Sequence, residues 1–301
     1  MGMNYIGIDI GGTGIKAALT DDSGIVLETL KTPTPAENLN DLIAAVSRLV
    51  AKFQQEVTVS GVGVGIAGLL NARTRIMETS PNIPCLNEVD IEKQLREALS
   101  VHVITENDAK AGAYGEWTAG AGRGRRHMAY ITIGTGLGCG LVLGGHMFRG
   151  TSGYAGELGH TVVEPRGRPC ACGSHGCLET RVSATGIVLT AREMNAANDN
   201  TTAESLYEAA TKGDRTAQSI FEETGRYLGI ACANLINLLN IEAIVVGGGV
   251  MASGDLLLGA ARAEAQRRAF PSSARDCAIV QSQLWPDSGT IGAAMLARDT
   301  A

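Results

Sequence analysis

Long apolar runs are missing from the sequence. No stretch approaches the roughly 18 consecutive apolar residues that a membrane-spanning helix needs. The N-terminal residues MGMNYIGIDI match neither a signal peptide nor a transit peptide. We therefore expect a cytoplasmic protein with no membrane contact, and in that compartment its seven cysteines should stay reduced.

An excess of positive charge is also missing. The formal net charge is −6, and the only basic cluster is the short run Arg123, Arg125, Arg126 and His127. A solvated loop accounts for such a short run. Because a general nucleic-acid binder shows a longer basic stripe, we expect no nucleic-acid partner.

Glycine is the residue in excess. It occupies 39 of 301 positions, which is roughly 13% against a usual value of about 7%. A G-x-y period is absent, so collagen is excluded, and the short glycine clusters indicate tight turns and close backbone approaches. The remaining composition, 45% apolar and 19% charged, is that of a soluble globular protein with room for two domains.

The first half of the chain predicts an α/β domain. Residues 4–31 alternate β-rich runs with Gly- or Asp-rich turns, a pattern typical of a three-stranded antiparallel meander. Apolar residues then recur at three- and four-residue steps over 39–53, which predicts an amphipathic helix. Buried strands are predicted at 61–68 and 101–105.

The opening pattern recurs at residues 128–150, where a Gly-Thr-Gly turn again joins two strands. The two halves therefore resemble a duplication in which each begins with a glycine hairpin facing a common cleft. Further helices are predicted at 183–195, 203–212, 215–239, 255–268 and 289–297, with strands at 241–246 and 277–281. We expect one domain from 1–118 together with 289–301, and a second from 119–288.

The first glycine hairpin is a candidate phosphate site. Its backbone N–H groups can bond phosphate oxygens, Thr13 adds a hydroxyl, and Lys16 adds a positive charge. Asp9, at the end of a buried strand, suits water-mediated Mg²⁺ binding. Taken alone, the stretch is more typical of a simple hairpin turn, because glycine-rich motifs often match by chance. The candidate residues are Asp9, Gly11, Gly12, Thr13, Gly14 and Lys16.

A second hairpin strengthens this interpretation, because two such turns could hold a nucleotide phosphate chain from both sides. A third glycine run follows a fully apolar strand and precedes a helix, the position at which open α/β sheets bind ligands. Neither matches a Walker A loop or a dinucleotide fingerprint. The residues are Gly134, Thr135, Gly136 and Gly138, followed by Gly247, Gly248 and Gly249.

The segment TENDAKAG places Asn107 and Asp108 between a predicted strand and a helix. Helix capping explains both residues, since Asn and Asp are preferred caps. Alternatively, Asp108 is a general base that accepts the proton of a substrate hydroxyl as its oxygen attacks phosphorus. The segment alone does not separate the two.

Three of the seven cysteines gather in GELGHTVVEPRGRPCACGSHGCLETR. Cys170, Cys172 and Cys177 follow His160, and three thiolates with one imidazole suit tetrahedral Zn²⁺. The alternative is three unrelated buried cysteines. Since four protein ligands leave no open position, we expect a structural zinc rather than a Lewis acid.

The ordered set D-x-G-G-T-x-x-K, E-N-D, G-T-G-x-G, E-x-G-H, C-x-C-G-x-x-G-C-x-E and G-G-G-V resembles the ROK family of sugar kinases and sugar-responsive repressors. The resemblance runs from Asp9 to about Ile291. It implies the duplicated ribonuclease-H-like fold of actin and hexokinase, with an interdomain cleft. Few residues precede the strand containing Asp9, so we expect a kinase rather than a DNA-binding repressor.

The resemblance also implies roles for residues. ATP phosphates would be held by the two hairpins and the nucleoside by Gly247 to Gly249. Asp108 matches the catalytic base, and His160 matches a residue that binds zinc through one ring nitrogen and sugar through the other. The matching sugar ligands are Asn82, Asn107, Glu157, His160 and Glu179.

The expected activity is therefore ATP-dependent phosphorylation of a hexose. Glucose to glucose 6-phosphate comes first, because GCLETRVSATGIV resembles glucokinase members of the family. Kinases of N-acetylmannosamine, N-acetylglucosamine or fructose are alternatives, and a non-catalytic sugar sensor is an alternative of another class. The expected small-molecule partners are sugar, ATP and Mg²⁺, and the family suggests a homodimer or higher homo-oligomer.

Overall fold

The computed structural model describes residues 3–301, except for the side chains of residues 252 and 253. Its contacts divide the chain into two compact units. Unit 1 holds residues up to Gly124, Gly140–Gly156 and Gln283–Ala301, and unit 2 holds Arg125–Cys139 and Glu157–Ser282. The sequence-based prediction placed all of 119–288 in the second domain, whereas these contacts group Gly140–Gly156 with unit 1. That segment is tied there by contacts such as the 2.9 Å hydrogen bond from the Ala72 N–H to the Ser152 carbonyl.

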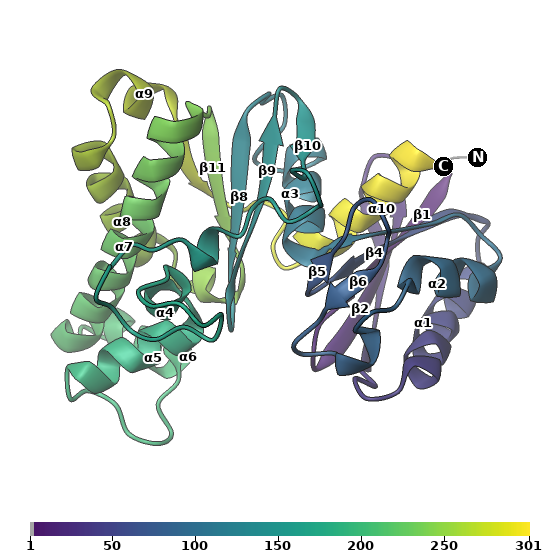
Figure 1. Ribbon diagram of the computed structural model, residues 1–301, viewed down its shortest axis with the longest axis horizontal. Helices are drawn as coiled ribbons and strands as arrows, with labels where there is room; N and C mark the ends of the chain where they lie inside the picture. Colours follow the sequence, from purple (N-terminus) through teal and green to yellow (C-terminus); the bar gives the residue numbers. More distant parts are fainter. Residues whose placement is uncertain (1–2) are drawn as a thin grey trace. The chain divides into compact units, whose positions relative to one another are not determined.

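The first five-stranded sheet has the order β3-β2-β1-β4-β7 (Figure 1). The three N-terminal strands pair antiparallel, which confirms the predicted meander, and β1, β4 and β7 run parallel. The predicted strand at 101–105 begins later and continues through Asn107. The strands are β1 (Asn4–Ile10), β2 (Gly14–Asp21), β3 (Val26–Pro33), β4 (Val59–Ile66) and β7 (Val103–Asn107).

The second five-stranded sheet repeats this order as β10-β9-β8-β11-β12. Its β8–β11 and β11–β12 pairs are parallel, and its β9–β10 pair is antiparallel, as in the corresponding strands of the first sheet. The α/β fold with two duplicated sheets, predicted from the repeated hairpin, is confirmed. The strands are β8 (Met128–Ile133), β9 (Leu137–Leu143), β10 (His146–Phe148), β11 (Ala243–Gly247) and β12 (Ala278–Gln281).

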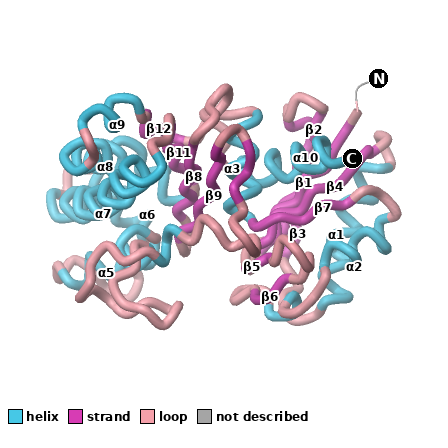
Figure 2. Tube along the Cα trace, turned by 45° about the horizontal axis from the view of Figure 1, so that its top comes forward, coloured by secondary structure: helices cyan, strands magenta, loops and turns pink. Residues whose placement is uncertain are grey.

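Helices cover both faces of the first sheet (Figure 2). On one face, α1 (Leu39–Gln54) packs with α2 (Ile91–Leu99), and its Leu42, Val46 and Val50 are fully buried in the main core cluster. On the other face lie α3 (Asp108–Thr118) and α10 (Ser288–Thr300). Smaller elements of this unit are β5 (Leu69–Leu70), β6 (Met77–Thr79) and the 3₁₀ turn η1 (Pro84–Leu86).

The C-terminal helix α10 approaches the first sheet unusually closely. A Cβ atom placed on Gly7 of β1 would lie 1.7 Å from the Thr290 carbonyl oxygen, and one on Gly63 of β4 would lie 1.7 Å from that of Ala293. Only glycine fits at either point, because any side chain would overlap the helix backbone. These two glycines therefore let α10 lie directly against β1 and β4.

In unit 2 the long helix α7 (Arg215–Leu239) packs along α8 (Gly254–Arg268). The α7 helix begins after Asp214, whose side chain accepts the Ala217 N–H at 3.0 Å, and it ends at Asn240 in the left-handed conformation. These bounds match the predicted helix at 215–239. The other elements are η2 (Leu158–His160), α4 (Glu179–Val182), α5 (Ala184–Glu193), α6 (Ala203–Thr211), η3 (Gly249–Ser253) and α9 (Pro271–Asp276).

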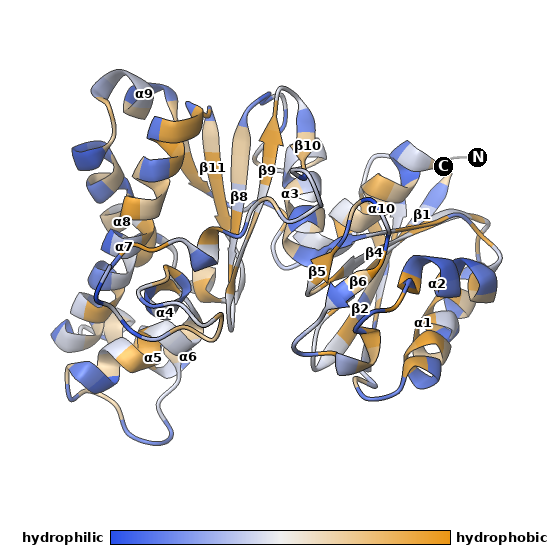
Figure 3. Cartoon of the chain, viewed as in Figure 1, coloured by the Kyte–Doolittle hydropathy of each residue, from blue (hydrophilic) through white to orange (hydrophobic). Residues whose placement is uncertain are grey.

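Apolar residues gather in the strands, as Figure 3 shows for β9 and β11, whereas α2 presents hydrophilic residues. Buried residues of β11 include Ile244, Val245 and Val246, which are fully shielded from solvent. Such continuous apolar strands are typical of parallel sheets covered on both faces. The part of the chain that the structure describes contains no helix that combines the length and the apolar character of a membrane span.

Candidate active site and metal centre

The turn from β7 into α3 separates the roles of Asn107 and Asp108. The Asn107 side-chain oxygen accepts the Lys110 N–H at 3.1 Å, so Asn107 is the cap of α3. Its side-chain amide donates to the Gly68 carbonyl at 3.1 Å and to Oδ1 of Asp108 at 2.9 Å. Capping is therefore supplied by Asn107, and the Asp108 carboxylate is available for another role.

The environment of Asp108 favours its protonated form. Burial raises the pKa of its carboxyl group, and the Ala109 N–H and the Lys110 charge only partly oppose this effect. A carboxylate with a raised pKa is a better proton acceptor than an exposed one. Asp108 thus has the chemical properties of a general base.

Asp9 is a second partly buried carboxyl group in this unit. Burial and the neighbouring charge of Asp108 raise its pKa to about 7, against the lowering influence of Lys16. Asp9 lies in β1 directly opposite Lys16 in β2. Two carboxyl groups that repel each other in this way would gain from a nearby divalent cation.

The first glycine hairpin joins β1 and β2. The Gly11 N–H donates to the Gly14 carbonyl at 3.0 Å, which closes the turn. Asn82 lies against it, since a Cβ atom on Gly12 would be 2.7 Å from Cβ of Asn82. The structure therefore brings one predicted sugar ligand beside the predicted phosphate loop.

Lys16 is already engaged by its own chain. Its Nζ lies 2.5 Å from Oδ1 of Asp287 and donates to the Pro286 carbonyl at 2.9 Å. If Lys16 contacts a phosphate as predicted, its ammonium group has to bind that phosphate and Asp287 together, or exchange one for the other. No local pattern predicts this ion pair, because Lys16 and Asp287 come from opposite ends of the chain.

The second hairpin lies between β8 and β9 and is closed by a 2.9 Å bond from the Gly134 N–H to the Gly136 carbonyl. Glu179 supports it: Oε2 accepts the Leu137 N–H at 2.7 Å, and a Cβ on Gly136 would lie 2.6 Å from the same oxygen. One carboxylate oxygen of this predicted sugar ligand therefore holds the predicted phosphate loop.

The third glycine run lies beside the second hairpin. Gly248 has φ of +94°, and a Cβ atom there would lie 2.3 Å from the Ile133 carbonyl oxygen, so a side chain is excluded. Ile133 is the residue before Gly134. The close packing of Gly248 against Ile133 thus places the glycine run at the end of β11 beside the second hairpin.

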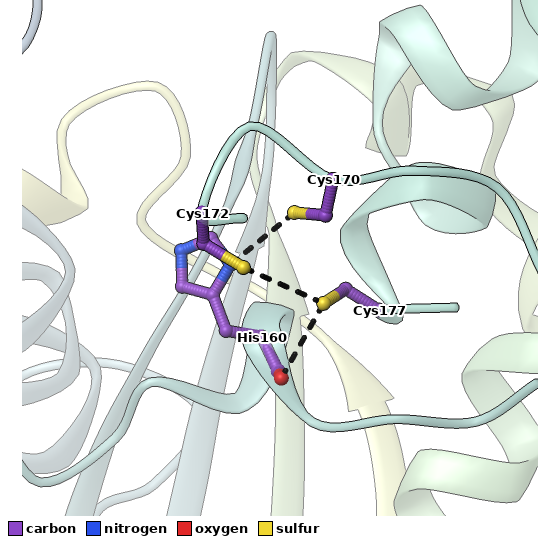
Figure 4. A group of neighbouring side chains, drawn as sticks. All are labelled: His160, Cys170, Cys172 and Cys177. Atoms are coloured by element: carbon purple, nitrogen blue, oxygen red, sulfur yellow. Dashed lines mark hydrogen bonds between the residues drawn. The ribbon is translucent and has the colours of Figure 1, made fainter. Parts of the chain in front are cut away.

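His160, Cys170, Cys172 and Cys177 form one cluster, shown in Figure 4. Their ligand atoms all lie within 4.8 Å of one another. Nδ1 of His160 is 3.7 Å from the Cys170 sulfur, and the sulfurs of Cys172 and Cys177 are 3.7 Å apart. A tetrahedral zinc ion with ordinary bond lengths requires separations of about 3.6–3.8 Å. The donor set and its spacing therefore fit zinc.

The loop that carries the cluster is folded by its own hydrogen bonds. The Cys170 N–H donates to the Ser174 carbonyl at 2.8 Å, and Gly176, with φ of +70°, has no room for a side chain beside the Glu164 carbonyl. Arg168 and Arg181 both pair with Glu193 of α5. The sequence does not predict these ion pairs, because Arg168 and Arg181 lie 25 and 12 residues away from Glu193 along the chain.

The cluster also joins the segments that carry three predicted sugar ligands. His160 ends the turn η2, and its N–H donates to the Glu157 carbonyl at 3.1 Å. Glu179 begins α4 two residues after Cys177, whose sulfur lies 3.5 Å from the His160 carbonyl oxygen. A metal bound here would fix the spacing between Glu157, His160 and Glu179.

A family model, sequence relatives and solved structures each match nearly the whole chain. The model of the ROK family matches residues 5–300. A glucokinase of Thermotoga maritima is 33% identical over 99% of this chain and 98% of its own length. A ROK family glucokinase from Streptomyces griseus, solved in complex with glucose and AMPPNP, superposes with a TM-score of 0.87 at 34% identity, covering 98% of this chain and 99% of that one.

A relative named for a different sugar is about as similar to this chain. An N-acetylmannosamine kinase of Escherichia coli is 32% identical over 98% of this chain and 99% of its own length. Overall identity therefore differs little between relatives named for glucose and one named for an N-acetylated sugar.

Proposed function

The chain belongs to the ROK family, and from this premise we propose that it transfers the γ-phosphoryl group of ATP to a hexose. Glucose is the first candidate substrate, with glucose 6-phosphate as the product. The observation that carries the proposal is the turn at Asn107 and Asp108, where capping by Asn107 leaves a partly buried carboxylate of raised pKa at the helix start.

In the proposed reaction, Asp108 accepts the proton of the sugar hydroxyl while that oxygen attacks the γ-phosphorus. The new oxygen–phosphorus bond forms as the bond between the γ-phosphorus and the bridging oxygen breaks, and ADP leaves with that oxygen. Little covalent chemistry falls to the protein, so its contribution is positioning and charge stabilisation.

Backbone groups and hydroxyls would hold the nucleotide. The hairpins Gly11 to Gly14 and Gly134 to Gly138 offer N–H groups and the hydroxyls of Thr13 and Thr135 to phosphate oxygens. Gly247 to Gly249 would face the nucleoside. Mg²⁺, when bound with ATP, would neutralise phosphate charge, and Asp9 would hold its coordinated waters.

The sugar hydroxyls would be bound by the polar side chains Asn82, Asn107, Glu157, His160 and Glu179. The Nδ1 side of His160 faces the cysteine cluster, so its Nε2 is the nitrogen left for a sugar hydroxyl. Zinc in the cluster would be structural, because His160 and the three cysteines complete a tetrahedral shell.

The test is a coupled assay of ADP release with glucose, fructose, mannose, N-acetylglucosamine and N-acetylmannosamine. The proposal expects turnover with glucose as the preferred sugar. Preference for N-acetylmannosamine would favour the activity named for the Escherichia coli relative. Sugar binding without ADP release would instead indicate a sugar sensor. We also propose a cytoplasmic location and assembly into a homodimer or a higher homo-oligomer.

A further inference from the structure

We propose that Glu106 and Arg149 form a positioning pair that fixes Asn107 and Asp108 for the reaction. The inference rests on the proposed kinase function and adds two residues to it. Both lie in unit 1, and neither is among the residues assigned to substrate, nucleotide or metal.

Hydrogen bonds connect the pair to the catalytic carboxylate. Nε of Arg149 donates to Oε2 of Glu106 at 2.7 Å, and Oε1 of Glu106 accepts the backbone N–H of Asn107 at 3.0 Å. The Asn107 side-chain amide then donates to Oδ1 of Asp108 at 2.9 Å. Three consecutive hydrogen bonds thus lead from Arg149 to the oxygen of the proposed base.

A carboxylate at position 106 is costly for the fold alone. Glu106 is only 5% exposed, and strand alternation places it on the same face of β7 as Ile104, which packs in the apolar clusters with Ala293 and Leu296 of α10. A buried charge is tolerated only when it is paired and hydrogen-bonded. An apolar residue would pack here, but it could not orient the Asn107 N–H.

Arg149 comes from a different part of the chain. It follows β10 and begins a loop in which its carbonyl accepts the Ala155 N–H at 3.1 Å and the Ser152 carbonyl accepts the Ala72 N–H. This loop runs directly into Glu157. The ion pair therefore anchors the start of the segment leading to a proposed sugar ligand onto the turn that carries the proposed base.

The test compares Arg149→Met, Glu106→Gln and the double variant in the full-length protein. Misplacing the base should lower kcat about ten- to a hundredfold, with the KM for ATP changing less than about twofold. The double variant should lose little more than either single one, because both remove the same pair. Arg149→Lys should recover part of kcat. As the matched control, Arg298→Met removes an arginine of similar exposure from a pair with Asp299 remote in sequence from the turn, and it should leave kcat within about twofold.

A second readout needs no turnover: amide hydrogen exchange at Asn107 should become faster in Arg149→Met and Glu106→Gln. Unchanged kcat in both folded variants, or equal losses in the Arg298→Met control, would overturn the positioning role. If Arg149→Met fails to fold, Glu106→Gln and Arg149→Lys carry the same comparison. If the wild-type protein phosphorylates no sugar, the proposed function fails, whereas the exchange at Asn107 still reports whether the pair holds the turn.

Discussion

Asn107 donates a 2.9 Å hydrogen bond from its side-chain amide to Oδ1 of Asp108 and caps α3 with its side-chain oxygen. One residue thus performs two tasks: it starts the helix and orients the neighbouring carboxylate. The amide must point its NH₂ group toward Asp108, because its oxygen is used by the Lys110 N–H. This fixed orientation holds Oδ1 of Asp108 in place beside the start of α3.

Replacing Asn107 with Ala should therefore affect both stability and catalysis. Loss of the cap should reduce the free energy of unfolding by about 1 kcal/mol, and loss of the amide should lower kcat. Asn38→Ala is the matched control, since Asn38 caps α1 in the same way by accepting the Asp41 N–H at 3.1 Å. Denaturant unfolding and steady-state kinetics would measure both effects. An equal loss of kcat in the two variants would contradict the role of Asn107 in orienting the base.

The raised pKa of Asp108 predicts the acid side of the pH–rate profile. The base works only when ionised, so kcat should fall as the pH drops through its pKa in the bound complex. Because burial raises that pKa above the ordinary value of 3.8, the decline should begin at a higher pH than it would for an exposed aspartate. Steady-state kinetics between pH 4 and 9 would show it. A kcat that stays constant down to about pH 4 would contradict the buried environment of Asp108.

Asp9→Asn should make stability less dependent on pH. The pKa of Asp9 is raised by folding from 3.8 to about 7, so the native state binds more protons and the wild type loses stability as pH rises between these values. The full cost above pH 7 is up to about 4 kcal/mol, from 1.36 kcal/mol per pKa unit. Calorimetry without nucleotide or Mg²⁺ should thus show that the stability of Asp9→Asn, relative to that of the wild type, increases from pH 4 to 8.

Asp21→Asn provides a control of opposite sign. Burial acts to raise the pKa of Asp21, but hydrogen bonds from Ser23 and Ile25 outweigh it and lower that pKa. The contribution of Asp21 to stability is present above its unfolded-state pKa and is lost as the pH falls. The stability of Asp21→Asn, relative to that of the wild type, should therefore decrease as the pH rises. Parallel stability curves for the wild type and Asp9→Asn would contradict the environment described for Asp9.

Removing the metal should damage sugar binding more than nucleotide binding. His160 is itself a proposed sugar ligand, and Cys177 lies two residues before Glu179, so an empty cluster releases both segments. Chelation or Cys172→Ser should raise the KM for sugar and leave the KM for ATP largely unchanged. Cys85→Ser, which alters an isolated thiol in unit 1, is the control. If the KM for sugar stays the same after the metal is lost, the cluster does not organise the sugar ligands.

The parts of this fold that could be predicted are those with a local pattern. The apolar spacing of 39–53 predicts α1, and the repeated glycine hairpin predicts the duplicated sheets, because period and turn chemistry are written in neighbouring residues. The cysteine spacing likewise predicts the cluster with His160. The glycines of the hairpins and the residues of the cysteine cluster could be named as site candidates because their patterns are local in the sequence.

Contacts between distant segments could not be predicted. Glu116 resembles an ordinary exposed helix residue, yet it is fully buried, and its carboxylate accepts the Ala121 N–H at 2.9 Å, the Leu284 N–H at 3.0 Å and the Ser288 hydroxyl at 2.9 Å. Its helix α3 is buried on most sides and so has no amphipathic pattern. The ion pair of Lys16 with Asp287 could not be predicted either, because it joins residues from opposite ends of the chain.

Transfer of the γ-phosphoryl group to a sugar, with Asp108 as the base, can be followed by ³¹P NMR. With ATP, Mg²⁺ and glucose, the wild type should convert the γ-phosphorus signal into that of a sugar monophosphate. Asp108→Asn should bind glucose with nearly unchanged affinity by calorimetry, but form the product at least about a hundredfold more slowly. Retained turnover in Asp108→Asn, or a wild type that binds glucose and forms no sugar phosphate, would contradict the account.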